Sequence, residues 1–457
     1  MKRNRVYIAK IVILLIFIWI VSLSNFVYAE ENNTLTNTTR VYFLAEITKG
    51  YANGDCILLE NYDSQGNKIY GMIDAGRKIA KEDKDGNAST SVKEFLKDHG
   101  VEKLEFLAIT HQHADHNGDA LTVLDNFEIK TIYMKEFDKK WSPSGRQDIY
   151  EDIIERAVAK NIKVVGVSHL SLTSSDISPS RSTDFINNTK NAKEELFESF
   201  NETNIKFEFG SSKIQIFNWE IFDENGNQYI TGKTTDKTRE IVTDDNNNSI
   251  AILLTQGEKK AFFAGDMNNN DKNEQTGRIG DEDRIKNLVG KIDLLKLGHH
   301  GYQGSNTEDY MNVLKPEYAV ITNDVDKAYA NTIAWLKNNN VNYLYTTSDP
   351  YEICATITDS KVYLGTEVPQ EKKDEENKDP KQEESSSTDN SDYASTSDSK
   401  EEKAATTTTT TRNAESDKTL ISTILPKTGV GKIGIGITIL VTVAVACFTR
   451  YKSIKVK

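Results

Sequence analysis

The amino-acid sequence predicts an α/β fold in which two mixed β-sheets are covered by helices on their outer faces. Short runs rich in β-branched and aromatic residues alternate with amphipathic stretches over residues 39–366, and no repeat period is visible. The first runs can pair as hairpins, whereas the later ones alternate with helical stretches. This order of elements predicts one folded domain over residues 39–366 of a chain of 457 residues.

Strands are predicted where the runs are short and β-branched, at residues 41–47, 56–60, 68–74, 104–110, 131–134, 163–167, 249–255, 260–265, 292–298, 318–322 and 343–347. Helices are predicted where apolar residues recur at helical spacing, at residues 91–98, 120–127, 150–160, 308–314 and 331–338. Residues 170–228 are rich in Ser, Asn and Thr and fit neither pattern. An insertion over the functional site is one interpretation of this segment.

The first 29 residues have the order of a secretory signal peptide. Basic residues at positions 2, 3, 5 and 10 precede an apolar run over 11–23, and the small-residue site Val27-Tyr28-Ala29 follows. The apolar run is short for a membrane span, so cleavage after Ala29 is expected and a retained membrane anchor is the alternative.

Residues 425–457 resemble the sorting signal of proteins that sortase attaches to peptidoglycan. The pentapeptide LPKTG at 425–429 precedes an apolar segment, predicted as a transmembrane helix over 433–449, and a basic tail. By this resemblance sortase cuts between Thr428 and Gly429, and the membrane holds the chain only before sorting. The expected partners are sortase and peptidoglycan, and the expected location is the cell-wall surface of a Gram-positive bacterium.

Residues 367–424 consist largely of Glu, Lys, Asp, Ser and Thr, with an unbroken threonine run at 406–411. Such a segment has too little apolar surface to offset the entropy lost on ordering, so it is predicted to be a disordered tether. The formal net charge of −13 argues against a basic surface that coats nucleic acid, although a local basic groove remains compatible with it.

Metal-capable side chains cluster directly after the predicted strand 104–110. His111, His113, Asp115 and His116 fall within six residues of a chain that has seven histidines. His111 and His113 are two apart in an extended segment and can share one ion, while Asp115 and His116 can face a second ion on the next turn. Mixed oxygen and nitrogen ligands suit zinc and also Mn²⁺ or Fe²⁺.

Two further ligand candidates stand at the ends of predicted strands. Asp266 follows the strand at 260–265, where its carboxylate can bridge two ions. His299 and His300 follow the strand at 292–298, and by residue type and position either histidine can complete the second site.

These motifs resemble the metallo-β-lactamase superfamily in order and spacing. The resemblance rests on the H-x-H-x-D-H run at 111–116, on Ile73-Asp74-Ala75-Gly76, on Gly265-Asp266 and on Gly298-His299-His300-Gly301. A closer resemblance is to the hydrolase domain of competence DNA-uptake channel proteins and to phosphorylcholine esterases. It rests on residues 53–55 (NGD), on residues 247–249 (NNS) and on the glycines and serine at 301, 304 and 305.

The resemblance implies a four-layer αββα sandwich with two divalent ions, zinc first among them, in the cleft at its edge. It assigns the first ion to His111 and His113 and the second to Asp115 and His116, with Asp266 as the bridge. His300 is then the favoured ligand, and His299 is the group that contacts substrate.

The resemblance also bears on Asp74 and His169, which are not expected to bind metal. Asp74 is implied to brace the histidine loop by hydrogen bonding rather than to touch metal. His169 is the only candidate for the superfamily's usual additional histidine, and we interpret it as a loop or strand histidine outside the site.

The implied mechanism is attack by a hydroxide, because two metal ions lower the pKa of a shared water from about 15.7 towards roughly 7. Asp115 acts within the metal site, and His299 and Tyr302 are the candidates for assisting the leaving group. Lys296 is a further candidate, or else a strand residue that points at solvent.

The predicted substrate is a phosphoester or phosphodiester, carried either by choline-like groups on teichoic acid or by extracellular nucleic acid. Hydrolysis of a lactone, an amide or a β-lactam is the alternative within the same fold. A surface adhesin without catalysis is the alternative outside it, and the complete set of candidate ligands argues against the adhesin.

Overall fold

The computed structural model describes residues 37–44, 54–78, 91–140, 142–174, 180–222, 228–229, 244–270, 279–325, 327–347 and 353–365. The predicted signal peptide, tether and sorting signal, with Thr428 and Gly429, lie outside these ranges. Among the described residues, no helix has the length and apolar character needed to cross a membrane.

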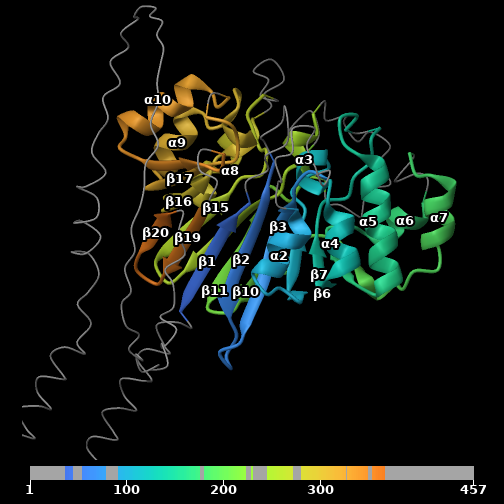
Figure 1. Cartoon of the computed structure of the whole chain (residues 1–457). Helices are drawn as coiled ribbons and strands as arrows, with labels where there is room; N and C mark the ends of the chain where they lie inside the picture. The colour runs from blue at the N-terminus through green and yellow to red at the C-terminus, as the bar shows by residue number, and fades with distance from the viewer. Residues whose placement is uncertain are drawn as a thin grey trace, which may run out of the picture. The chain divides into compact units, whose positions relative to one another are not determined.

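The larger sheet of the described chain is mixed, with strand order β20-β19-β1-β2-β3-β5-β7-β8-β9 (Figure 1). Its antiparallel strands are β1 (Thr38–Phe43), β2 (Cys56–Tyr62), β3 (Lys68–Ala75), β19 (Ile353–Thr358) and β20 (Val362–Gly365). Its parallel strands continue from β3 as β5 (Phe106–Ala108), β7 (Thr131–Tyr133), β8 (Lys163–Val165) and β9 (Phe197–Glu198).

The second sheet is also mixed, with strand order β10-β11-β14-β15-β16-β17-β18. The strands are β10 (Lys206–Phe209), β11 (Ser212–Phe217), β14 (Ala251–Gln256), β15 (Lys259–Phe263), β16 (Leu294–Lys296), β17 (Tyr318–Ile321) and β18 (Asn342–Tyr345). Pairing is antiparallel up to β15 and parallel from β15 to β18. Short two-stranded pairs join β4 (Lys103–Leu104) to β6 (Glu128–Ile129) and β12 (Ile221–Phe222) to β13 (Gln228–Tyr229).

The described helices lie between the strands in the chain order. They are α2 (Val92–Asp98), α3 (Ala114–Asn117), α4 (Ala120–Asn126), α5 (Gln147–Lys160), α6 (His169–Thr173), α7 (Thr183–Thr189), α8 (Asp281–Val289), α9 (Glu308–Leu314) and α10 (Ala330–Asn338). Three short 3₁₀ turns are η1 (Glu194–Leu196), η2 (Asp245–Asn248) and η3 (Gly298–Gly301).

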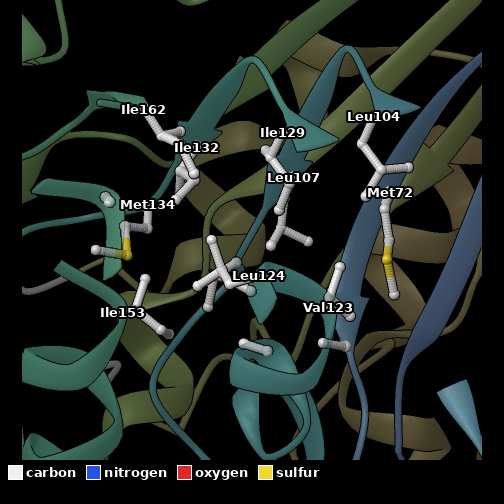
Figure 2. Packing of buried hydrophobic residues seen from close by; sticks show 14 of the residues in the cluster. Met72, Leu104, Leu107, Val123, Leu124, Ile129, Ile132, Met134, Ile153 and Ile162 are labelled. Carbon is white, nitrogen blue, oxygen red and sulfur yellow. The ribbon is translucent and has the colours of Figure 1, made fainter. Parts of the chain in front are cut away.

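Three hydrophobic layers hold the sheets and helices together. Between the sheets, Phe43 and Phe106 of the larger sheet belong to one buried cluster with Phe263 of the second sheet. Figure 2 shows the layer outside the larger sheet, where Leu107 on β5 lies near Leu124 on α4. A third cluster packs β14 to β17 against α8, α9 and α10. The predicted arrangement of two mixed sheets with helices on their outer faces is therefore confirmed.

Two local expectations are wrong. The predicted strand over 104–110 is divided, because its first residues pair with β6 while β5 joins the larger sheet. The segment 170–228 is not simply an insertion, because it contributes β9 to the larger sheet and β10 and β11 to the second. Its polar residues fill the turns and the short helices α6 and α7 between buried strand positions.

Candidate metal centre

The candidate ligands meet where strands of the two sheets end. The histidine loop 110–116 follows β5, which runs parallel to β3, and Asp74 lies at the end of β3. Asp266 follows β15, and the parallel neighbour β16 leads into η3, which carries His299 and His300. The carboxyl ends of parallel strands lie at one edge within each sheet, and the contact between His116 and His300, 184 residues apart, shows that the two edges supply one site.

His111 and His113 bring two ring nitrogens together. The Nε2 atom of His111 lies 3.0 Å from the Nδ1 atom of His113. The other ring nitrogen of His111 lies 3.1 Å from the hydroxyl of Thr110, and that hydroxyl donates to Asp74 Oδ2 at 2.7 Å. The hydroxyl oxygen must therefore accept a hydrogen bond from His111 Nδ1–H. This tautomer leaves a lone pair on the inward Nε2.

A similar relay fixes the ring of His113. Its Nε2 atom lies 3.1 Å from the hydroxyl of Ser144, which donates to Asp244 at 3.5 Å. The Ser144 oxygen also accepts the backbone N–H of Asp245 at 2.8 Å. The proton of His113 therefore sits on Nε2, and the lone pair on Nδ1 faces His111.

His116 and His300 form a second pair, with their Nε2 atoms 3.3 Å apart. The Nδ1 atom of His116 donates to Asp74 Oδ2 at 2.7 Å. The Nδ1 atom of His300 lies 2.9 Å from the hydroxyl of Thr322. Both outer nitrogens thus have acceptors, and both inward nitrogens present lone pairs to the same space.

Asp266 lies between the two nitrogen pairs. Its Oδ1 atom is 3.1 Å from His116 Nε2, and its Oδ2 atom is 3.4 Å from His300 Nε2 and 3.8 Å from His111 Nε2. The side chain is 2% exposed, and its Oδ1 atom makes no hydrogen bond with any described residue. A buried carboxylate oxygen of this kind normally has a partner, so a cation fits this position.

Asp115 closes the second group from the side of the histidine loop. Its Oδ2 atom lies 3.6 Å from His300 Nε2 and pairs with Arg77 at 3.0 Å. The Arg77 side chain is 26% exposed, so its guanidinium lies at the edge of the site.

The donor set fits two divalent ions. Tetrahedral zinc with Zn–N bonds of about 2.0–2.1 Å places neighbouring ligand nitrogens about 3.3–3.4 Å apart. The two observed separations are 3.0 and 3.3 Å. His111, His113 and Asp266 form one metal-capable group, and His116, His300, Asp266 and Asp55 form another, so Asp266 is common to both.

The electrostatics of the site favour a bound cation. Burial lowers the pKa of His111 well below its usual value, and the neighbouring His116 lowers it further. Burial would also lower the pKa of His116 and His300, but the nearby carboxylates, Asp266 foremost, raise both well above the usual value. The buried carboxylates therefore attract positive charge to the inward ring nitrogens, where a proton or a metal ion can supply it.

His299 and Tyr302 lie beside the two groups. His299 is 23% exposed, belongs to neither group, and places Nε2 at 3.2 Å from the amide nitrogen of Asn246. Its Nδ1 atom is buried and makes no hydrogen bond within the described part of the chain. The Tyr302 ring lies 5.3 Å from that of His299, centroid to centroid, so the two side chains pack against each other.

His169 lies apart from both metal-capable groups of the described chain. It begins α6, and its Nε2 atom lies 3.2 Å from the backbone carbonyl of Ala192. A hydrogen bond to the backbone thus accounts for this histidine, although it sits in a short helix rather than in the expected loop or strand.

The sequence does not predict the contacts of several residues of the site. Lys296 is fully buried and ion-pairs with Asp55, so of its two interpretations the solvent-facing strand residue is wrong. Its position in an otherwise apolar strand was a usable signal, because a lysine is rarely buried without a partner. Thr322 and Ser144 carried no such signal, because hydroxyl residues are common in loops and at strand ends.

The chain is similar to known proteins in sequence and in fold. The sequence model described as the metallo-beta-lactamase superfamily matches residues 53–322. Recombination protein 2 of Haemophilus influenzae is 33% identical over 78 residues, which is 17% of this chain and 9% of that protein. The chain thus matches only a small part of that curated relative.

Among solved structures, similar folds occur in a mutant of the β-hydroxylase CmlA and in a diphosphatase of the PhnP family. The first is 11% identical, with 70% of this chain and 54% of that chain covered and a TM-score of 0.37. The second is also 11% identical, with 70% of this chain and 98% of that chain covered and a TM-score of 0.34.

Proposed function

The chain belongs to the metallo-beta-lactamase superfamily, and from this premise we propose that it is a dinuclear metallohydrolase that cleaves a phosphoester or phosphodiester at the bacterial cell surface. The observation that carries the proposal is the orientation of four histidines. Their inward nitrogens face one another in pairs at 3.0 and 3.3 Å, while every outer nitrogen has a hydrogen-bond acceptor. Lone pairs this close repel unless a cation lies between them.

In this proposal His111 and His113 hold one ion, and His116, His300 and Asp115 hold the other, with Asp266 shared. When bound, the ions supply an activated water nucleophile and stabilise negative charge on the substrate oxygens. Zinc is the first candidate, and Mn²⁺ or Fe²⁺ also suit the donor set.

The residues beside the metal groups orient the substrate and assist its leaving oxygen. His299 accepts from Asn246 through Nε2, so its proton lies on Nδ1, which can donate a hydrogen bond to that oxygen as negative charge develops on it. Tyr302 packs against the ring of His299 and limits its rotation. Arg77, at the edge beside Asp115, provides a positive charge for an anionic substrate.

Two adjacent ions suit in-line displacement at phosphorus, which favours a phosphodiester over a lactone, an amide or a β-lactam. The name of the curated relative, Recombination protein 2, makes nucleic acid one substrate to test. The net charge of −13 makes binding along a long phosphate backbone less favourable, so a teichoic-acid phosphodiester is the preferred class.

The proposed location rests on the sequence motifs at 1–29 and 425–457. Sortase would join Thr428 to peptidoglycan, and the polar tether at 367–424 would carry the hydrolase domain through the wall. Protoplast release tests this: wall digestion should free the wild-type chain but not a Thr428→Ala variant. Equal behaviour of the two chains would contradict anchoring.

The test of the chemistry is hydrolysis of bis-p-nitrophenyl phosphate by the full chain, after removal of metal and reloading with Zn²⁺. We expect turnover that depends on zinc and that exceeds turnover of a chromogenic lactone and a chromogenic β-lactam. His113→Ala should abolish it. Faster cleavage of the lactone or the β-lactam would contradict the phosphodiester assignment, and loaded protein inactive on all three substrates would contradict the proposed reaction class.

A further inference from the structure

We propose that Asp55, Thr322 and Lys296 form a positioning network that fixes the tautomer and the orientation of His300 and so builds the second metal group. This inference rests on the proposed function and assigns a positioning role to three buried residues behind the metal groups. All three side chains are at most 2% exposed, and none of them faces the open side of the site.

The first part of the network is a relay of hydrogen bonds behind His300. The hydroxyl of Thr322 donates to Asp55 Oδ1 at 2.7 Å, so its oxygen accepts a hydrogen bond from His300 Nδ1–H at 2.9 Å. Asp55 Oδ1 also lies 3.3 Å from the same Nδ1 atom. This relay holds the proton on Nδ1 and leaves Nε2 able to bind an ion.

The second part neutralises the buried Asp55. The ammonium group of Lys296 forms an ion pair with Asp55 Oδ2 and donates to the carbonyl of Gly265 at 3.1 Å. It lies 3.8 Å from Asp266 Oδ1. One buried cation thus contacts the carboxylate behind His300 and the backbone that carries the bridging Asp266.

Proximity alone would also make Asp55 a candidate ligand, because it belongs to the second metal-capable group. Its contacts argue for a positioning role. Asp55 meets His300 at Nδ1, whereas Asp266 and Asp115 meet the same ring at Nε2, on the opposite side. Both Asp55 oxygens are already engaged, by Thr322 and by Lys296.

His116 is held by a comparable device, which supports this interpretation. Asp74 accepts from His116 Nδ1, from the Thr110 hydroxyl and from the Thr110 backbone N–H, all at 2.7 Å. Each histidine of the second pair therefore has a buried carboxylate and a threonine hydroxyl on its outer side. For His300 the hydroxyl stands between the ring and the carboxylate.

The test measures Zn²⁺ stoichiometry and affinity by calorimetric titration of the full chain, for wild type, Asp55→Asn, Thr322→Val and Thr322→Ser. Glu60→Gln is the matched control, because Glu60 also forms a buried ion pair, with Arg40 at 2.7 Å, but belongs to neither metal-capable group. A chelator competition provides a second measure of affinity that does not depend on catalysis.

We expect two ions in wild type and a 10- to 100-fold weaker affinity for one of them in Asp55→Asn and Thr322→Val, the usual effect of removing a group behind a ligand. Thr322→Ser keeps the hydroxyl and should restore the affinity. Glu60→Gln should unfold more readily yet bind both ions as wild type does.

Unchanged affinity for both ions in Asp55→Asn and Thr322→Val, with two ions in wild type, would overturn the positioning network and leave the proposed function intact. So would equal weakening in the Glu60→Gln control. Should Asp55→Asn fail to fold, the comparison of Thr322→Val with Thr322→Ser decides. Wild-type protein that binds no zinc would instead overturn the proposed function, and the network with it.

Discussion

At the scale of single residues, the positions of four protons decide what the site can bind. Each outer ring nitrogen donates a hydrogen bond, to Thr110, Ser144, Asp74 or Thr322, so four lone pairs point inward. An imidazole binds a metal ion through its neutral form, and its second nitrogen then needs a hydrogen-bond acceptor. These acceptors therefore favour, even without a bound ion, the neutral tautomer of each histidine that has its lone pair on the inward nitrogen.

Asp74→Asn should weaken zinc binding by 10- to 100-fold with little disturbance of the backbone. Asp74 has a left-handed φ of 56°, which Asn adopts readily, so the change mainly removes charge and one acceptor from behind His116. Chelator competition measures the affinity. Wild-type affinity in the variant would show that His116 does not need this carboxylate.

The neighbours His299 and His300 allow a matched comparison, because both have left-handed φ values, 48° and 52°. Asparagine tolerates this conformation, so the same substitution can be made at each position. His300→Asn should lose one ion. His299→Asn should keep two ions and lose activity by about 10²- to 10³-fold, as expected when a hydrogen-bond donor to developing negative charge is removed. Metal analysis and steady-state kinetics on both variants provide the comparison.

The reverse result would exchange the two roles. If His299→Asn lost an ion while His300→Asn kept both, the assignment of His300 as the ligand would be wrong. The burial of the two residues argues for the assignment made here, since His300 is fully buried and His299 is 23% exposed.

At the scale of elements, η3 is a strained connection held from both sides. Two consecutive left-handed residues other than glycine cost of order 1–3 kcal/mol each. The turn is fixed by Gly298, whose backbone N–H donates to Asn306 at 2.9 Å and whose carbonyl accepts from the same side chain at 2.9 Å. Glu282 of α8 in turn accepts the backbone N–H groups of Asn306 and Thr307. Helix α8 thus supports the turn that presents His300.

Glu282 makes the stability of this region depend on pH. Burial, with a smaller contribution from the charge of Asp283, raises the pKa of Glu282 to about 7 despite its hydrogen bonds. Between about pH 4.5 and pH 7 the unfolded chain therefore releases a proton that the folded chain keeps, so the contribution of Glu282 to stability falls as the pH rises. The loss amounts to about 3 kcal/mol at most.

Urea unfolding at pH 4.5 and pH 7 measures this effect in wild type and in Glu282→Gln, which cannot titrate. The difference in unfolding free energy between wild type and variant should decrease towards pH 7. A difference that stays constant, or that increases with pH, would mean that the pKa of Glu282 is not raised in the folded protein.

At the scale of the whole molecule, the sequence predicts what is local and periodic. The two sheets, most strand cores and the cluster of His111, His113, Asp115 and His116 follow from runs of adjacent residues. Asp266 and the His299-His300 pair were found because each follows an apolar strand closely. The site forms because parallel strands bring these strand ends together at one edge within each sheet, and the two edges meet.

The rest depends on contacts between distant parts of the chain. Thr322 and Asp55 are 267 residues apart and meet only once both sheets are formed. The sequence does not predict the strands of segment 170–228, because they are short and polar residues dominate the composition. The tautomers of the histidines depend on single hydroxyl groups, such as that of Ser144, which no pattern of residue types distinguishes from any other serine.

The central claim is that one shared carboxylate, Asp266, joins two metal sites. It is tested most directly by counting metal ions per chain, by mass spectrometry, in zinc-loaded wild type, His113→Ala and Asp266→Asn. We expect two ions in wild type, one tightly held ion in His113→Ala, and weakened retention of both ions in Asp266→Asn. A wild-type chain that retains no zinc under any loading condition, or an Asp266→Asn variant that retains both ions as wild type does, would contradict it.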